Sequence, residues 1–141
     1  MKKYFTKSAD ETKKLGESLG RKLKAGDIVA MFGTMGMGKT AFTQGILKGM
    51  ENPAQVYSPT FALVNNYGGN PTVYHFDMYR INTWDDLYST GFFDYLDGDS
   101  VLIIEWSENI KNAIPDYAHR IYFEKGNEDT DRIITSSVDM D

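Results

Sequence analysis

Two short, continuous apolar runs stand out in the hydrophobic pattern of this chain. They cover residues 27–32 (DIVAMF) and 101–104 (VLII). Runs of this length, bounded by turn residues, are typical of strands with both faces buried. We therefore expect these two segments to form buried strands of a sheet.

A helical pattern precedes the first of these strands. Leucines recur at every fourth position from Leu15 to Leu23, and Ser8 and Glu11 have the spacing of a capping box. The pattern predicts an amphipathic helix over residues 9–24 that ends at a glycine.

A second helix is expected after the first strand and a glycine-rich turn. It places Phe42, Ile46 and Leu47 on one side and stops at Gly49 or Asn52. The alternation of strands and helices indicates an α/β fold.

The second half of the chain is richer in strand and turn signals. Two β-rich runs at 61–67 and 72–77 flank a Gly-Gly-Asn-Pro turn, which predicts a hairpin. Late runs at 120–124 and 132–135 predict another hairpin. The remaining expected features are a capped helix after Thr83, a helix over Glu108–Ile114 and a partly frayed acidic tail within residues 127–141.

The strongest motif is GTMGMGKT at residues 33–40, which fits the phosphate-loop pattern G-x-x-x-x-G-K-[ST] in full. It follows a predicted strand and opens a predicted helix. Glycines let the backbone curl so that successive N–H groups point at phosphate oxygens, and the helix N-terminus adds its dipole. We expect the Lys39 ammonium to bridge the β- and γ-phosphates and the Thr40 hydroxyl to bind Mg²⁺. The cofactor-binding residues predicted for this loop are Gly33, Thr34, Met35, Gly36, Met37, Gly38, Lys39, Thr40 and Ala41.

A phosphate loop also needs an acid for the metal or the attacking water, normally at the end of an apolar strand. Asp77 and Glu105 both end such strands. Since the carboxyl ends of strands frame the ligand crevice of an open α/β sheet, either acid is a candidate on position alone. His75 shares the strand face of Asp77, where a lone histidine is more often a hydrogen-bonded structural residue than a base.

Charge is unevenly distributed along the 141 residues, whose net charge is -5. Residues 1–48 carry ten Lys and Arg against four Asp and Glu, whereas residues 49–141 carry five against sixteen. The basic N-terminal third leaves direct contact with a nucleic acid open, although charge runs usually mark solvated helix faces.

Without cysteine, disulfide scaffolds and cysteine nucleophiles are excluded. Without an apolar leader or a membrane-length run, we expect a cytoplasmic protein that does not enter membranes.

Two other nucleotide-using classes are disfavoured. The chain has no Asn-Lys-x-Asp and no Asp-x-x-Gly motif, so a Ras-like GTPase is not expected. Small-molecule kinases usually carry an arginine-bearing lid that neutralises the transferred phosphoryl group. Here only Arg80 lies near a strand-end acid, which leaves a kinase as a distant alternative.

Four segments in this order resemble the bacterial TsaE family: GTMGMGKTAFTQGI, VYSPTFALVNNY, HFDMYRI and IIEWSE. The resemblance covers roughly residues 5–125. It implies a small P-loop ATPase for the threonylcarbamoyladenosine modification of tRNA. It also implies binding of ATP and Mg²⁺, weak hydrolysis of ATP, and action with TsaB and TsaD, the complex that transfers the threonylcarbamoyl group.

The resemblance also assigns roles to single residues. Thr60 matches the switch-like threonine near the γ-phosphate, and Asp77 matches the acid that positions or activates water. Glu105 matches the acid that helps Thr40 to hold Mg²⁺, with Trp106 as the aromatic beside it. The implied catalytic set is Lys39, Thr60 and Asp77.

Two positions depart from the family pattern. Thr34 stands where the family usually has Asp, and Ser107 stands where it usually has Pro. Neither departure removes a group that the phosphate chemistry requires.

We therefore expect a single P-loop NTPase-like α/β domain over residues 1–141. Its sheet should be mixed and mostly parallel, with antiparallel hairpins and flanking helices. The expected function is Mg²⁺-dependent ATP binding with slow hydrolysis to ADP and phosphate, in support of tRNA threonylcarbamoylation. The alternative is a nucleotide-gated binding or assembly subunit in which hydrolysis is incidental.

Overall fold

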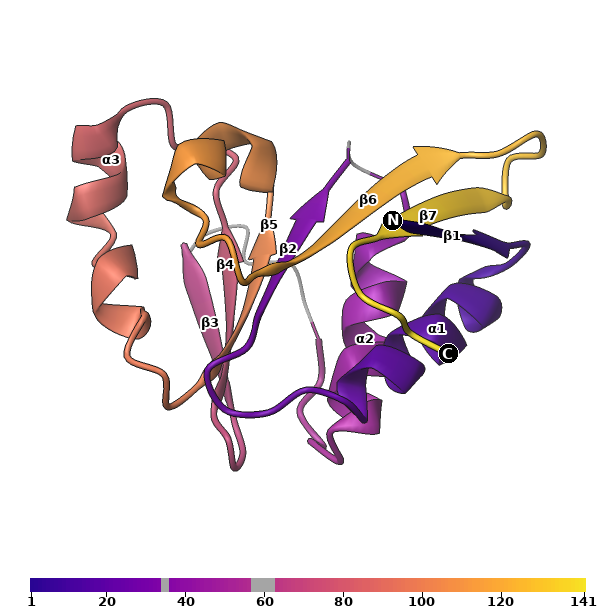
Figure 1. Ribbon diagram of the computed structural model, residues 1–141, viewed down its shortest axis with the longest axis horizontal. Helices are drawn as coiled ribbons and strands as arrows, with labels where there is room; N and C mark the ends of the chain where they lie inside the picture. Colours follow the sequence, from indigo (N-terminus) through magenta and orange to yellow (C-terminus); the bar gives the residue numbers. More distant parts are fainter. Residues whose placement is uncertain (34–35, 57–62) are drawn as a thin grey trace.

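A computed structural model describes residues 1–33, 36–56 and 63–141 of the chain. The described residues form one sheet with helices on both sides (Figure 1). In chain order the elements are β1 (Lys2–Thr6), α1 (Ala9–Gly20), β2 (Ile28–Phe32), α2 (Lys39–Gly49), β3 (Val64–Gly68), β4 (Val73–Asp77), α3 (Trp84–Ser89), the 3₁₀ helix η1 (Phe92–Tyr95), β5 (Val101–Glu105), the 3₁₀ helix η2 (Ser107–Ala113), β6 (His119–Lys125) and β7 (Arg132–Ser136).

The sheet has seven described strands in the order β1-β7-β6-β2-β5-β4-β3. The strands β6, β2, β5 and β4 run parallel to one another, whereas β3, β7 and β1 pair antiparallel with their neighbours. Parallel strands bring their carboxyl ends to one edge of the sheet, so the residues that follow β2, β4 and β5 meet there.

Each face of the sheet carries its own hydrophobic core. Helices α1 and α2 cover one face, and α3, η1 and η2 cover the other (Figure 1). Strand β2 divides its side chains between the two, with Val29 and Met31 in the first core and Ala30 and Phe32 in the second. All five residues of β2 are buried. The absence of polar residues from this run predicts that both faces of the strand are covered.

Helices α1 and α2 pack unusually close to each other. A β-carbon at Gly16 would overlap the carbonyl oxygen of Phe42, and one at Gly45 would overlap that of Lys13. The two backbones therefore touch where larger side chains would keep them apart. This contact places the helix that follows the phosphate loop directly against α1.

Most predicted elements are confirmed. Both apolar runs are buried strands, and both predicted hairpins form, β3–β4 and β6–β7. The Ser8 hydroxyl accepts from Glu11 N at 3.1 Å, and the Thr83 hydroxyl accepts from Asp86 N at 3.0 Å, as their capping roles predict. Phe61, where the first hairpin is predicted to begin, lies outside the described residues.

Two helix predictions were wrong in detail. The helix expected over residues 9–24 ends at Gly20, because the chain tightens into 3₁₀-type bonds such as Lys22 N to Leu19 O at 2.9 Å. Leu23 still packs against the core, so its spacing is meaningful although it lies beyond the helix. The helix expected over Glu108–Ile114 is 3₁₀ and is kinked at Ile110.

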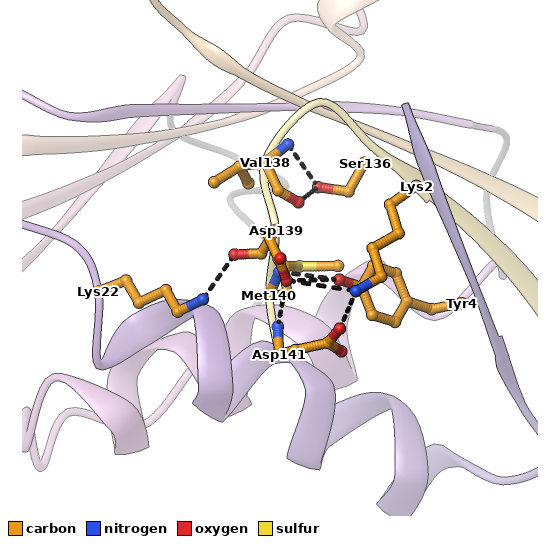
Figure 2. Close-up of polar contacts among 8 residues, drawn as sticks. All are labelled: Lys2, Tyr4, Lys22, Ser136, Val138, Asp139, Met140 and Asp141. Carbon is orange, nitrogen blue, oxygen red and sulfur yellow. Dashed lines mark hydrogen bonds and ion pairs between the residues drawn. The ribbon is translucent and has the colours of Figure 1, made fainter.

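The C-terminal tail corrects the expectation of fraying. Part of residues 127–141 forms β7, and beyond it Met140 is fully buried. Figure 2 shows how the tail is held: Met140 N donates to the Tyr4 hydroxyl at 2.9 Å, and Lys22 Nζ donates to Asp139 O at 2.7 Å. The short polar tail gave no sign of this, because its partners lie at the other end of the chain.

Strand β1 was missed for a related reason. Its first residues are lysines, and it forms an edge strand whose stability comes from pairing with β7. No helix in the part of the chain that the structure describes is long and apolar enough to cross a membrane.

The close contact of α1 and α2 predicts that Gly45→Ala destabilises the protein. Alanine normally stabilises a helix relative to glycine by up to about 1 kcal/mol. Here the added methyl group would collide with α1, and overpacking costs about 1–3 kcal/mol. We expect a lower free energy of unfolding, measured by urea denaturation.

Gln44→Ala is the matched control, because it lies on the exposed side of the same helix. It should change the free energy of unfolding by no more than about 0.5 kcal/mol. A Gly45→Ala variant that is more stable than the wild type would contradict the close packing.

Candidate functional site

The glycine-rich turn after β2 leads directly into α2. Its backbone has φ values of 140°, 81° and 94° at Gly33, Gly36 and Gly38, which residues with a side chain rarely adopt. The first N–H groups of α2 have no partner within the helix, and the helix dipole makes this end attractive to anions. Thr34 and Met35, predicted to belong to the loop, lie outside the described residues.

Lys39 is the first residue of α2, and only 5% of it is exposed. Its Nζ donates to the carbonyl oxygen of Gly33 at 2.6 Å and lies 4.8 Å from the centre of the Trp106 ring. The cation–π contact and the hydrogen bond hold the ammonium at the mouth of the loop. Trp106 reaches this position through a left-handed backbone, with φ of 58°.

The electrostatic surroundings of Lys39 suit a negatively charged ligand. Burial lowers the pKa of Lys39 from its ordinary value, and the negative charges of Glu105, Glu108 and Asp77 oppose this shift. A buried cation is costly unless anions surround it. A phosphate at the loop would add negative charge where this cation lacks solvent.

The two predicted acids lie at the same edge of the sheet. Asp77 ends β4 and Glu105 ends β5, and the register makes them direct neighbours. Strand β5 lies between β2 and β4, so Glu105 is one strand from the phosphate loop and Asp77 is two strands away. The structure thus brings both candidates together with Lys39; their catalytic roles stay predictions.

Asp77 lies in a partly buried environment. Burial is the main cause that raises the pKa of Asp77 above its ordinary value, and the charge of Glu105 adds to it. The backbone N–H of Tyr79, which donates to Asp77 Oδ1 at 2.9 Å, opposes the shift, as do His75 and Lys39. A raised pKa is typical of a carboxylate that exchanges protons with a substrate or water.

Glu105 is more deeply buried and is held by a partner. Its Oε2 lies 2.6 Å from Nε2 of His75, which is itself only 1% exposed. His75 is therefore hydrogen-bonded, as a lone histidine on this strand face was expected to be. The sequence did not indicate that its partner would be Glu105, the predicted metal-binding acid.

Glu108 belongs to the site but was missed. Its Oε2 accepts from Gly33 N at 3.0 Å, so it fixes the start of the phosphate loop. Ser107, the departure from the family pattern, is fully buried and donates to Ile104 O at 3.1 Å, which begins the turn into η2. The sequence signal that could have found Glu108 is its position three residues after Glu105, at the start of a predicted helix.

Arg132 was also missed. Its Nη2 donates to Gly36 O at 3.0 Å and its Nη1 to Asp129 O at 2.6 Å, so β7 supports the phosphate loop from the side. The sequence places Arg132 almost a hundred residues from the loop, and no local pattern links the two.

The chemistry of the donors fits Mg²⁺ at this edge. Mg²⁺ prefers oxygen ligands and is usually held by one or two carboxylates together with phosphates and water. Thr40 is an exposed residue at the start of α2, and Glu105 ends a strand next to β2. Over the described ranges, no group of three or more His, Cys, Asp or Glu residues could hold a metal ion. Thr60, predicted to lie near the γ-phosphate, is outside the described residues.

Known proteins that resemble this chain belong to one family. The family model described as "Threonylcarbamoyl adenosine biosynthesis protein TsaE" matches residues 6–134. The chain belongs to the TsaE family. This family takes part in the biosynthesis of threonylcarbamoyladenosine in tRNA.

Individual TsaE proteins cover most of the chain. The protein named "tRNA threonylcarbamoyladenosine biosynthesis protein TsaE" from Treponema pallidum is 35% identical over 79% of this chain and 83% of its own length. The TsaE protein of Rickettsia conorii is 44% identical over 76% of this chain and 62% of its own length. The crystal structure of Bacillus subtilis YdiB superposes with a TM-score of 0.76 at 28% identity, covering 96% of this chain and 83% of YdiB. The fold is that of TsaE proteins.

The raised pKa of Asp77 predicts that Asp77→Asn stabilises the ligand-free protein at neutral pH. Asparagine is neutral and still accepts the hydrogen bond from Tyr79 N–H. The cost of burying the charge is complete above the folded-state pKa and vanishes below the ordinary value of 3.8. The gain in melting temperature should therefore shrink as the pH falls toward about 4.

Asp94→Asn is the control, because that carboxylate is exposed on η1. Its melting temperature should follow the wild type at each pH. A neutral-pH melting temperature of Asp77→Asn below that of the wild type would show that the carboxylate is not destabilised by burial.

Proposed function

We propose that this protein binds ATP with Mg²⁺ and hydrolyses it slowly, in support of tRNA threonylcarbamoylation together with the TsaB–TsaD complex. One observation carries the proposal. A complete phosphate-loop motif opens α2, and the two strand-end acids Asp77 and Glu105 lie beside it in register. Membership of the TsaE family supplies the pathway.

The loop and Lys39 would bind the triphosphate. The positive φ values of Gly36 and Gly38 allow the curled backbone that directs N–H groups at phosphate oxygens. Lys39 would exchange its hydrogen bond to Gly33 O for contacts with the β- and γ-phosphates. There its charge offsets the negative charge that develops on the transferred phosphoryl group.

Asp77 would act on the attacking water. Water forms a bond to the γ-phosphorus as the bond to the bridging oxygen of ADP breaks, and the water loses a proton. A carboxylate with a raised pKa, held by Tyr79 N–H, is suited to orient that water and accept the proton. The products are ADP and inorganic phosphate.

Thr40 and Glu105 would hold Mg²⁺. The ion, when bound, neutralises phosphate charge and orients the phosphate oxygens. A single carboxylate and a hydroxyl leave most of the coordination to nucleotide and water. Binding of the metal should therefore depend on the nucleotide.

Hydrolysis by the isolated protein should be slow and should rise with the TsaB–TsaD complex. In the described part of the chain, the arginine that approaches the loop, Arg132, is bound to Gly36 O through one side of its guanidinium. P-loop NTPases often gain large rate factors when a partner completes the site with positive charge. Exposed basic residues, such as Lys14 in α1 and Arg21 directly after it, are candidates for direct contact with tRNA.

The test is ATP turnover of the purified protein, alone and with a purified TsaB–TsaD complex. Lys39→Ala should lose ATP binding, because it removes the buried cation. Asp77→Asn should keep binding and lose turnover by about 100-fold or more.

Asp94→Ala serves as the control for the loss of a carboxylate outside the site, and its turnover should match the wild type. Unchanged turnover in Asp77→Asn would remove the proposed role of Asp77. Failure of the complex to raise turnover would contradict a partner-completed ATPase.

The same Asp77→Asn variant separates the two functional hypotheses. If hydrolysis is required, a strain that carries only this variant should lack threonylcarbamoyladenosine in its tRNA. If the modified nucleoside persists at wild-type levels, the protein acts as a nucleotide-gated subunit and hydrolysis is incidental.

A further inference from the structure

A polar chain crosses three neighbouring strands on one face of the sheet. Side chains alternate between faces along a strand, so Tyr67 of β3, His75 of β4 and Glu105 of β5 share the face that α1 and α2 cover. On β3 the register shifts between Asn66 and Gly68, at the position of Tyr67.

The chain is continuous, short and buried. The Tyr67 hydroxyl lies 2.8 Å from Nδ1 of His75, and Nε2 of His75 lies 2.6 Å from Oε2 of Glu105. Tyr67 is 8% exposed, His75 1% and Glu105 9%. Water therefore competes little for these bonds.

The chemistry of the partners sets the direction of the chain. A carboxylate only accepts, so Nε2 of His75 must carry the proton that is shared with Glu105. In the neutral ring Nδ1 is then an acceptor, and the Tyr67 hydroxyl donates to it. The Tyr67 hydroxyl thus favours the tautomer of His75 that can donate a hydrogen bond from Nε2 to Glu105.

We propose that His75 is a positioning residue that orients Glu105 for Mg²⁺, with Tyr67 fixing its tautomer. His75 occupies Oε2 of Glu105 and leaves Oε1 for the ion. This inference rests on the proposed function, since it concerns the acid assigned to Mg²⁺.

Lys39 is the reason that Glu105 needs such a partner. The negative charge of Glu105 acts on Lys39, whose ammonium lies in the same buried region. Among the charges that favour the ammonium of Lys39, that of Glu105 has the largest effect, so without His75 the carboxylate would be attracted toward Lys39. A Glu105 carboxylate that turns toward Lys39 would no longer be oriented for the metal.

The experiment measures the affinity of the protein for ADP by calorimetry, first with EDTA and then over a titration of Mg²⁺. ADP avoids turnover, so the readout is binding and not activity. His75→Leu should leave the affinity in EDTA unchanged. It should raise the Mg²⁺ concentration at half-saturation by about 10–100-fold, which is typical when the partner of a metal ligand is lost.

Two further variants keep the test informative if His75→Leu does not fold. His75→Gln supplies an amide N–H in place of the ring N–H and should restore much of the Mg²⁺ response. Tyr67→Phe removes only the outer hydroxyl and should shift half-saturation in the same direction, but less.

Ile103→Val is the control for a general loss of packing. Ile103 is the register neighbour of His75 on β5 and is fully buried, but it has no polar role. Its Mg²⁺ half-saturation should equal that of the wild type.

Nitrogen NMR of the histidine ring gives a readout that needs no ligand. In the ligand-free protein His75 should carry its proton on Nε2. A neutral ring protonated only on Nδ1 would overturn the inference.

The outcomes distinguish this inference from the function on which it rests. If Mg²⁺ does not change the ADP affinity of the wild type, the metal site fails and both are wrong. If the wild type responds to Mg²⁺ and the folded variants at His75 and Tyr67 respond equally, only the positioning role is overturned. A parallel fall of affinity in EDTA would assign His75 a merely structural role.

Discussion

Lys39 carries a positive charge into a place where only 5% of the residue reaches solvent, and the carboxyl edge of the sheet is arranged around that charge. Burial works against the ammonium, and the charges of Glu105, Glu108 and Asp77 work for it. Gly33 O and the Trp106 ring supply the direct contacts. These groups come from the ends of β2, β4 and β5 and from the start of η2, so the site forms only when these elements are assembled.

The two acids at this edge have different surroundings although they are neighbours in register. Asp77 is partly open, accepts a hydrogen bond from Tyr79 N–H, and has a raised pKa. Glu105 is buried and bound to His75. A carboxylate that exchanges a proton benefits from a raised pKa, whereas a metal ligand benefits from a fixed orientation. These different surroundings support the proposal that Asp77 acts on water and Glu105 holds the ion, and both roles stay predictions.

The scaffold holds this edge rigid from two sides. At Gly16 and Gly45 the backbones of α1 and α2 are in direct contact, so α2, which begins at Lys39, has little room to shift relative to α1. From the far end of the chain, Arg132 donates to the carbonyl of Gly36. The tail around the buried Met140 is hydrogen-bonded to Tyr4 of β1 and to Lys22, just after α1 (Figure 2). Glu108 holds the other end of the loop at Gly33 N.

The sequence by itself determined the α/β fold class, the buried strands β2 and β5, the helix that follows the phosphate loop, and both hairpins. These features follow from local causes, namely apolar runs, capping side chains and glycine-rich turns, which act within a few residues. It also placed Lys39, Asp77 and Glu105 at element ends, where a parallel sheet gathers its ligands. Only the tertiary structure decided the bond between His75 and Glu105, the hold of Glu108 and Arg132 on the loop, and the packing of Met140. Each of these joins groups from separate elements, and their meeting depends on strand order and register, which no local pattern of the chain encodes.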